Sequence, residues 1–400
     1  ASEVLQGIED DDQSRSEWVS MRARGMDLLG IKLEQPRADV GGTGAPMDGM
    51  STVRHPLLLE ACLRFQANAM GELLPANGPV KVENYGLGST QGDTDADQLE
   101  EDLNRYLTSH DGAPEYYPDT DRMLFGVGFG GMGFKKLYHC PLRRRPVSES
   151  VDANNLIVSN DATDIRNAAR VTHAIKMRRS VMKRMQFVKA YREVDLSEPV
   201  VDTNRIDDKV KQTQGLESKP KNPKDNQYTI LECYTELNIR GHEHRDEDGQ
   251  ITGLPMPYKL SIDKTSRKIL EIRRNWNEDD ENYQARRVFV AYQFVPMFGF
   301  WASGLLQILG NTSTALTGAW RILLDTGMFA NFPGFLYALG GDRQTDLNFR
   351  VPPGGGAGVD IAGTDDIRKA IMPLPYQTQH MGPLQSMVGD IAQTGQRLGG

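Results

Sequence analysis

The uncharged run from Val288 to Trp320 constrains the fold of this chain more than any other feature of its sequence. A run of this length can span a bilayer as a helix. Polar side chains such as Gln293, Gln307 and Asn311 interrupt it, and glycines recur in it. We therefore expect a buried strand followed by a helix that packs against protein on most sides. A membrane-inserted pore built on residues 288–320 stays open as an alternative.

The second half of this run continues into a long helical pattern, "SGLLQILGNTSTALTGAWRILLDTG". Its leucines recur at intervals that place them on one helical face. Either the chain itself or a second subunit can cover such a face. We assign three of these leucines to subunit packing: Leu305, Leu309 and Leu316.

Glycines crowd the stretch "LFGVGFGGMGFKK", residues 124–136, and three of them match the motif G-x-G-x-x-G. In dinucleotide-binding folds this motif follows a strand and opens a helix. Here "YYPDTDRMLF" precedes the glycines and a strand-like pattern follows them. We therefore expect a helix whose glycines allow close packing against protein, with no ligand. A nucleotide-binding enzyme remains the alternative. The packing glycines are Gly126, Gly130, Gly131 and Gly133, with Gly128 between them.

Charge and composition narrow the function classes. A length of 400 residues predicts two or three domains, and the net charge of −8 does not attract nucleic acid at long range. The three cysteines are far apart, so no disulfide framework or C-x-x-C metal site is expected. His242 and His244 lie in an acidic hairpin-turn pattern, which we interpret as solvated in preference to metal-binding. We predict that the chain is not an enzyme and has no catalytic, cofactor or metal site.

Residues 166–192 are basic and contain no carboxylate. Such a segment can contact phosphates. The alternatives are a solvated helix face or pairing with acidic segments such as residues 93–102. The candidate contacts to DNA or another polyanion are Lys183, Arg184 and Arg192.

Local patterns predict the other elements. Helices are expected over "STVRHPLLLEACLRFQANAMGELLP", over "DADQLEEDLNRYLTS" and over "GPLQSMVGDIAQTGQRL". The second of these has an apolar face lined by Leu99, Leu103, Tyr106 and Leu107. Residues 203–227 are expected to form a flexible loop. Hairpin-like strands in residues 228–275 predict a small β module that projects from the body.

Several stretches, in this order, resemble portal proteins of tailed bacteriophages of the short-tailed podovirus type. They include "RHPLLLEACLRFQANAMGELLPANGPVK", "GVGFGGMGFKKLYHCPLRRRP", "NNLIVSNDATDIRNAARVTH", "FVPMFGFWASGLLQILG" and "DIRKAIMPLPYQ". The resemblance implies a multi-domain α+β subunit with a wing, a helical stem and a β-rich clip. It assigns the wing to 1–165, the stem entry to 166–200 and the clip to 201–280. Residues 281–340 would form a returning channel helix, and 341–400 more wing and the start of a crown that is otherwise missing.

The resemblance also implies function and partners. Twelve subunits would form a ring at one capsid vertex, through which duplex DNA passes during packaging and ejection without being read. Expected partners are the major capsid protein, terminase and a tail adaptor, with no membrane. The ring would be part of the virion and would assemble in the host cytoplasm.

Overall fold

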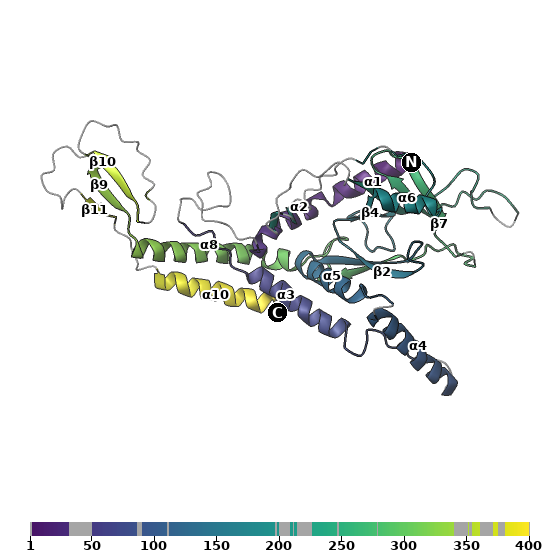
Figure 1. Cartoon of the computed structure of the whole chain (residues 1–400), viewed down its shortest axis with the longest axis horizontal. Helices are drawn as coiled ribbons and strands as arrows, with labels where there is room; N and C mark the ends of the chain where they lie inside the picture. The colour runs from purple at the N-terminus through teal and green to yellow at the C-terminus, as the bar shows by residue number, and fades with distance from the viewer. Residues whose placement is uncertain are drawn as a thin grey trace. The chain divides into compact units, whose positions relative to one another are not determined.

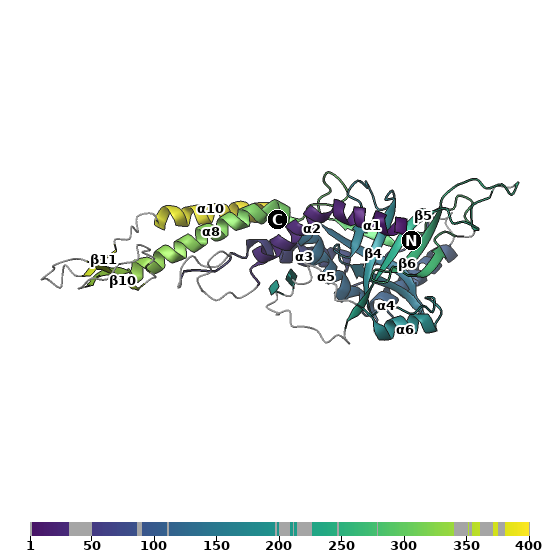
Figure 2. The same ribbon diagram turned by 90° about the horizontal axis from the view of Figure 1, so that it is seen from above.

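A computed structural model describes residues 2–31, 50–85, 90–109, 112–196, 198–199, 209–210, 212–213, 226–245, 248–277, 279–339, 351, 354–360, 371–374 and 381–399. The chain is 43% helical and 23% strand, which confirms the expected α+β class. It divides into two compact units (Figures 1 and 2). Unit 1 comprises residues 1–24, 62–211 and 217–307, and unit 2 comprises residues 25–61, 212–216 and 308–400. The expected flexible loop at 203–227 lies almost entirely outside the described residues.

Unit 1 combines helices with two antiparallel sheets. Its helices are α1 (Ser2–Ser14), α2 (Ser16–Gly25), most of α3 (Leu57–Leu73), α4 (Thr90–Thr108), α5 (Tyr116–Gly130) and α6 (Arg179–Phe187). One sheet has the order β2-β1-β8, formed by β1 (Met132–Cys140), β2 (Arg145–Val151) and β8 (Phe289–Gln293). The other has the order β3-β4-β5-β6-β7, formed by β3 (Leu156–Val158), β4 (Arg170–Arg178), β5 (Gln227–Leu237), β6 (Met256–Asp263) and β7 (Ile269–Arg274).

The expected β module is part of this larger sheet. Strand β5 pairs along its length with β4, from Arg178 opposite Gln227 to Arg170 opposite Thr235. The prediction of a separate projecting unit over 228–275 is therefore wrong. It failed because the strand pairing joins segments far apart in the sequence, which a local pattern does not reveal. The basic segment was expected to enter a stem. Part of it instead forms strand β4, which lies next to the central strand β5 of this sheet.

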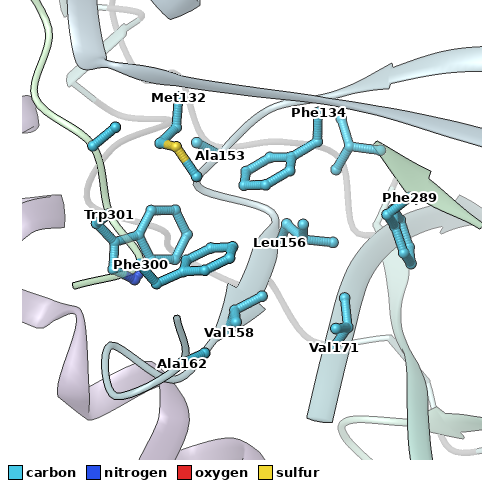
Figure 3. Packing of buried hydrophobic residues seen from close by; sticks show 12 residues of the cluster. Met132, Phe134, Ala153, Leu156, Val158, Ala162, Val171, Phe289, Phe300 and Trp301 are labelled. Carbon is cyan, nitrogen blue, oxygen red and sulfur yellow. The ribbon is translucent and has the colours of Figure 1, made fainter. Parts of the chain in front are cut away.

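A buried aromatic cluster fills the space between the two sheets of unit 1 (Figure 3). Phe134 of β1 and Phe300 stack with ring centroids 6.2 Å apart, and Trp301 meets both rings edge-on. Leu156 of β3 packs in the same cluster. In the first part of the uncharged run, the buried residues are thus mainly Phe300 and Trp301, which lie in the loop after β8. Strand β8, expected to be buried, has only Phe289 buried.

The glycine stretch has a packing role inside the chain. Helix α5 ends at Gly130, Gly131 adopts φ +93°, and strand β1 follows, which is the reverse of the nucleotide-binding order. A Cβ added at Gly128 would lie 2.6 Å from the Phe65 ring, and one at Gly133 would lie 2.6 Å from Val127 Cγ2. Gly126 is the exception, because its added Cβ would meet only Arg22 Nη2, at 3.8 Å.

Unit 2 is built on a pair of helices. Helix α10 (Met381–Gly399) runs beside α8 (Leu305–Asn331) in the opposite direction (Figures 1 and 2). Leu316 of α8 and Val388 of α10 pack with Leu57 at the start of α3. The short helix η1 (Met26–Leu29) also belongs to this unit. The long helix expected from the second half of the uncharged run onward and the helix expected over "GPLQSMVGDIAQTGQRL" are both confirmed.

A small sheet follows α8 in unit 2. Strand β9 (Phe335–Leu339) lies between β10 (Gly356–Asp360), which is parallel to it, and β11 (Ile371–Pro373), which is antiparallel. The sequence predicted only the end of a helix here. Pro333 and Gly334 end α8 because proline cannot continue a helix.

Candidate nucleic-acid interface

Helix α6 presents the basic residues singled out from the sequence. One side of this nine-residue helix packs on the large sheet, where Met182 contacts a buried cluster that includes Met177, Ile230 and Leu270. The other side therefore faces solvent. Lys183 and Arg184 lie on this exposed side.

The chain after α6 is fixed alongside strand β7 by backbone hydrogen bonds. The amide groups of Ala190 and Tyr191 both donate to the carbonyl of Met185, and the amide of Arg192 donates to the carbonyl of Leu270 at 2.8 Å. Tyr191 is buried. These bonds hold Arg192 next to β7, although the two segments are far apart in the sequence.

Helix α6, this turn and β7 enclose a surface groove of about 950 Å³. Its basic lining residues are Lys183, Lys189, Arg192 and Arg273. Two apolar side chains in its lining are strongly exposed, Phe187 at 88% and Ile272 at 44%. We call this site the basic groove. It combines cationic groups with an exposed aromatic ring, a combination that suits a polyanion or an acidic protein surface.

Most cationic side chains on α6 and in the groove lack a carboxylate partner among the described residues. In the part of the chain that the structure describes, no carboxylate pairs with Lys183, Arg184, Lys189 or Arg192. Of the two carboxylates in the lining, Glu193 is exposed. The other, Glu271, already accepts a hydrogen bond from Ser261 and pairs with Lys259 and Arg273.

The structure thus brings Lys183 and Arg192 to one groove and leaves Arg184 on the same helix outside its lining. Sequence reasoning missed Phe187 and Arg273. Phe187 follows Lys183 by four residues, a spacing that places the two on one helical face. Arg273 belongs to strand β7, which is far from α6 in the sequence, so no local pattern connects the two.

A buried ionic network lies between the two sheets of unit 1. Lys136 of β1 pairs with Glu232 of β5 at 2.7 Å, with both side chains at most 5% exposed, and Lys259 pairs with Glu232 at 3.0 Å. Burial alone would raise the pKa of Glu232, but the two ammonium groups and the Tyr234 hydroxyl lower it to about 2. Every charge here is compensated by a neighbouring group. We therefore interpret the network as structural.

His173 of β4 lies beside this network. Its buried imidazole makes the free energy of unfolding depend on pH. Burial and the Lys136 ammonium lower the pKa of His173 from 6.5 to about 3. Below pH 6.5 the unfolded chain takes up a proton that the folded chain rejects, so stability falls as the pH falls. Between pH 6.5 and 4.5 the free energy of unfolding of the native chain falls as the pH falls. His173→Gln should reduce the slope of this fall by about 1.4 kcal/mol per pH unit. Urea unfolding at several pH values measures this.

The matched control is His242→Gln, because His242 is exposed. This change removes an exposed imidazole and leaves the buried site of β4 intact. Equal slopes for His173→Gln and the native chain would contradict the assignment.

The other candidate sites do not assemble. His244 Nδ1 lies 2.7 Å from the Thr252 hydroxyl in a solvent-exposed turn, and His242 is exposed. Among the described residues there is no group of three or more side chains arranged to hold a metal ion. Burial raises the pKa of the Cys62 thiol to about 12 and that of Cys233 to about 11, so both are poor nucleophiles.

Leu305, Leu309 and Leu316 are each at most 1% exposed within the single chain. Gly130 and Gly131 are also buried, and their neighbours are residues of the same chain. A role for these residues between subunits stays a prediction.

The helix pair α8 and α10 offers a second kind of surface. Its four charged residues are Arg321, Asp325, Asp390 and Arg397. Two of these are engaged within the unit: Arg321 donates to the carbonyl groups of Thr52 and Val53, and Asp325 accepts from the Ser51 amide. The large apolar side chains of Ile308, Ile322, Leu324, Met387 and Leu398 are exposed on this pair. Most of the other exposed side chains are small or carry neutral amides or hydroxyls. The exposed amide and hydroxyl groups belong to Asn311, Thr314, Asn331, Gln385, Ser386, Gln393, Thr394 and Gln396.

Comparison with known proteins adds no relative: no protein-family model matches the chain, and no curated protein matches it. In the described part of the chain, no helix has the combined length and apolar character needed to cross a membrane.

Proposed function

We propose that this chain is a portal-type subunit, which closes into a ring and lets duplex DNA pass through the centre. The observation that carries the proposal is the antiparallel helix pair of unit 2. It has few free charges, and the chain that connects its two helices forms a small sheet, which lies beyond the end of α8 (Figure 1). A helical stem that bears a β-rich clip requires such a combination of helices and strands.

The proposal assigns the stem to α8 and α10 and the clip to the sheet β9–β11. This differs from the layout expected from sequence, which gave the stem entry to 166–200 and the clip to 201–280. The strands in those two ranges pair with one another in a single sheet of unit 1, where a wing assignment suits them better. The described residues of unit 2 supply both the helices and the strands that the layout requires.

Exposed apolar side chains in unit 2 support assembly. Ile322 is 54% exposed on α8, and Phe332, at the end of the same helix, is 64% exposed. On β11, Met372 is 59% exposed. Several exposed apolar side chains on one unit are typical of surfaces that a partner covers. Neighbouring copies in a ring would cover them, and a copy number of twelve follows from the resemblance.

The charge distribution suits a conduit. Each phosphate that a channel wall retains adds to the barrier against sliding, so a wall of neutral amides and hydroxyls lets DNA move. The net charge of −8 per chain opposes tight binding of DNA as well. Under this proposal the ring occupies one capsid vertex of a virion, with the major capsid protein, terminase and a tail adaptor as its neighbours.

DNA binding by the assembled particle tests the conduit. We expect weak affinity, equal for two unrelated duplexes and at least about tenfold weaker at 200 mM than at 50 mM salt, because any contacts are to phosphates. Fluorescence anisotropy with both duplexes at both salt concentrations measures this. Tight binding that prefers one sequence and survives the salt increase would overturn the conduit.

A further inference from the structure

Strand β8 lies at one edge of its sheet, and half of its backbone groups point away from its neighbour β1. Alternate residues of an antiparallel strand exchange hydrogen bonds with the neighbouring strand. The amide of Leu137 donates to the carbonyl of Val288, and the amide of Phe294 donates to the carbonyl of Gly131, so the even-numbered residues from 288 to 294 face β1. The residues that face away are Phe289, Ala291 and Gln293.

This outer edge of β8 is unpaired. In the part of the chain that the structure describes, no hydrogen bond reaches the outward amide and carbonyl groups of β8. Beyond Gln293 the chain covers the edge itself, because Val295 and Ser303 exchange backbone hydrogen bonds of 3.2 and 3.0 Å. The free edge therefore coincides with β8, which is five residues long. An unpaired edge of this kind is a template to which another strand can add.

A cleft of about 1010 Å³ opens beside this free edge, within unit 1. Phe289 and Ala291 of β8 form part of its lining, together with Val171 of β4 and Tyr234 of β5. The rings of Phe289 and Tyr234 meet edge-on, with centroids 5.4 Å apart. The space next to the unpaired backbone groups thus has apolar and aromatic side chains in its lining, which suit the side chains of an added strand.

Two arginines of the same lining have no carboxylate partner. Arg286 and Arg287 lie just before β8 in the chain and are exposed, and among the described residues neither forms an ion pair. The other two arginines of the lining are paired, Arg166 with Asp164 and Arg170 with Asp11. One exposed carboxylate of the lining, Glu236, is left. The uncommitted charge at this cleft is therefore positive, and it lies at the start of β8.

We propose that an extended segment of a partner protein adds to β8 as the fourth strand of the sheet β2-β1-β8 and places acidic side chains beside Arg286 and Arg287. Main-chain hydrogen bonds to the free edge supply affinity, and the arginines supply specificity. The strand runs antiparallel to β8, as its neighbours in this sheet do, so its acidic residues lie at its C-terminal end. The inference concerns unit 1 alone and does not depend on the proposed ring.

Peptide binding to the full chain tests this inference. The probe is the fluorescein-labelled peptide Thr-Val-Thr-Val-Asp-Glu, and fluorescence anisotropy measures its affinity. A second peptide carries N-methyl groups on its Thr and Val amides, which keeps the side chains and charges but removes the donors of an added strand. It should bind about tenfold more weakly or worse, because at least two backbone hydrogen bonds are lost. A third peptide, which ends in Lys-Lys, should also bind at least about tenfold more weakly, since it brings like charges together.

Charge reversal in the chain tests the same contact from the other side. Arg286→Glu with Arg287→Glu should weaken binding of the acidic peptide at least about tenfold and favour the Lys-Lys peptide. The hydrogen bonds between Arg286 and Asn275 use only the backbone of Arg286, so this variant should keep the native unfolding midpoint. The matched control is Arg105→Glu with Arg122→Glu, an equal change of charge at exposed positions outside the cleft. It should bind the acidic peptide like the native chain.

Hydrogen exchange reports directly on the free edge. Without the peptide, the outward amides of Phe289, Ala291 and Gln293 should exchange faster than the inward amides of Val290 and Tyr292. Saturating acidic peptide should slow the outward amides, because they then donate to the added strand. Mass spectrometry of fragments that cover residues 287–295 measures the change.

Four outcomes would overturn the inference. The acidic peptide could fail to bind the native chain at millimolar concentration. Equal binding of the N-methylated peptide would show that no strand is added, and equal binding to the Arg286 and Arg287 variant would show that acidic residues are not selected. Slow exchange of the outward amides in an assembled particle without peptide would assign the edge to a second copy. Each of these results would leave the proposed function untouched.

Discussion

Gly131→Leu is expected to leave the chain largely unfolded or unable to assemble. Gly131 adopts φ +93°, a conformation that costs a side-chain-bearing residue about 1–2 kcal/mol. An added Cβ would lie 2.4 Å from the carbonyl oxygen of Ala302 and 2.7 Å from the amide nitrogen of Gly304. Because the obstacle is backbone, the site cannot relax by moving a side chain. Overpacking adds about 1–3 kcal/mol.

Urea unfolding followed by circular dichroism measures this loss. Gly126→Ala is the control, because its Cβ would meet only Arg22 Nη2 at 3.8 Å and alanine favours the helix by about 0.5–1 kcal/mol. Gly304→Ala, on the other side of the same contact, should resemble Gly131→Leu, since its Cβ would lie 2.4 Å from the Gly131 amide nitrogen. A native-like midpoint for Gly131→Leu would show that this backbone contact does not hold the fold together.

Lys136→Met should lower the free energy of unfolding by about 3 kcal/mol, the lower end of the range for breaking a buried ion pair. The change leaves the Glu232 carboxylate buried with Lys259 as its remaining ionic partner. The cost comes from the loss of a partner for a buried charge, and it appears at pH 7, where Glu232 is ionised. Chemical denaturation gives the value.

Arg24→Met serves as the comparison, because the Arg24–Glu17 pair is 70% and 80% exposed. Exposed pairs contribute about 0–1 kcal/mol. Adding Glu232→Gln to Lys136→Met should recover part of the loss, since it removes a buried carboxylate that has lost one of its two ionic partners. If Lys136→Met cost no more than Arg24→Met, the network would not be holding the two sheets together.

Local patterns were sufficient for the helices. Helices α3, α4, α8 and α10 lie where apolar spacing and the positions of proline predicted them. The apolar face of α4 could also be identified, but amphipathic spacing does not show whether anything covers such a face, and Leu99 and Leu103 on it are 50% and 38% exposed. The order of helix, glycine and strand around Gly131 was also readable, since it reverses the order of a nucleotide-binding loop.

Pairings across the sequence could not be predicted in the same way. Strand β4 lies within the basic segment, and only its nine-residue pairing with β5 shows that it is a strand. The basic groove depends on that sheet, because Arg273 reaches α6 only through the order of strands β4 to β7. Lys183 and Arg192 could be identified as candidates, whereas the shape of their site and its exposed Phe187 ring could not.

The central claim is that this chain closes into a ring around a hole. Electron microscopy of the purified native chain, viewed end-on, together with particle mass from light scattering, tests it most directly. We predict a closed ring of many copies, twelve if the resemblance holds, with a central opening wide enough for duplex DNA. A compact particle without an opening, or a monomer at every concentration and salt tested, would contradict the claim.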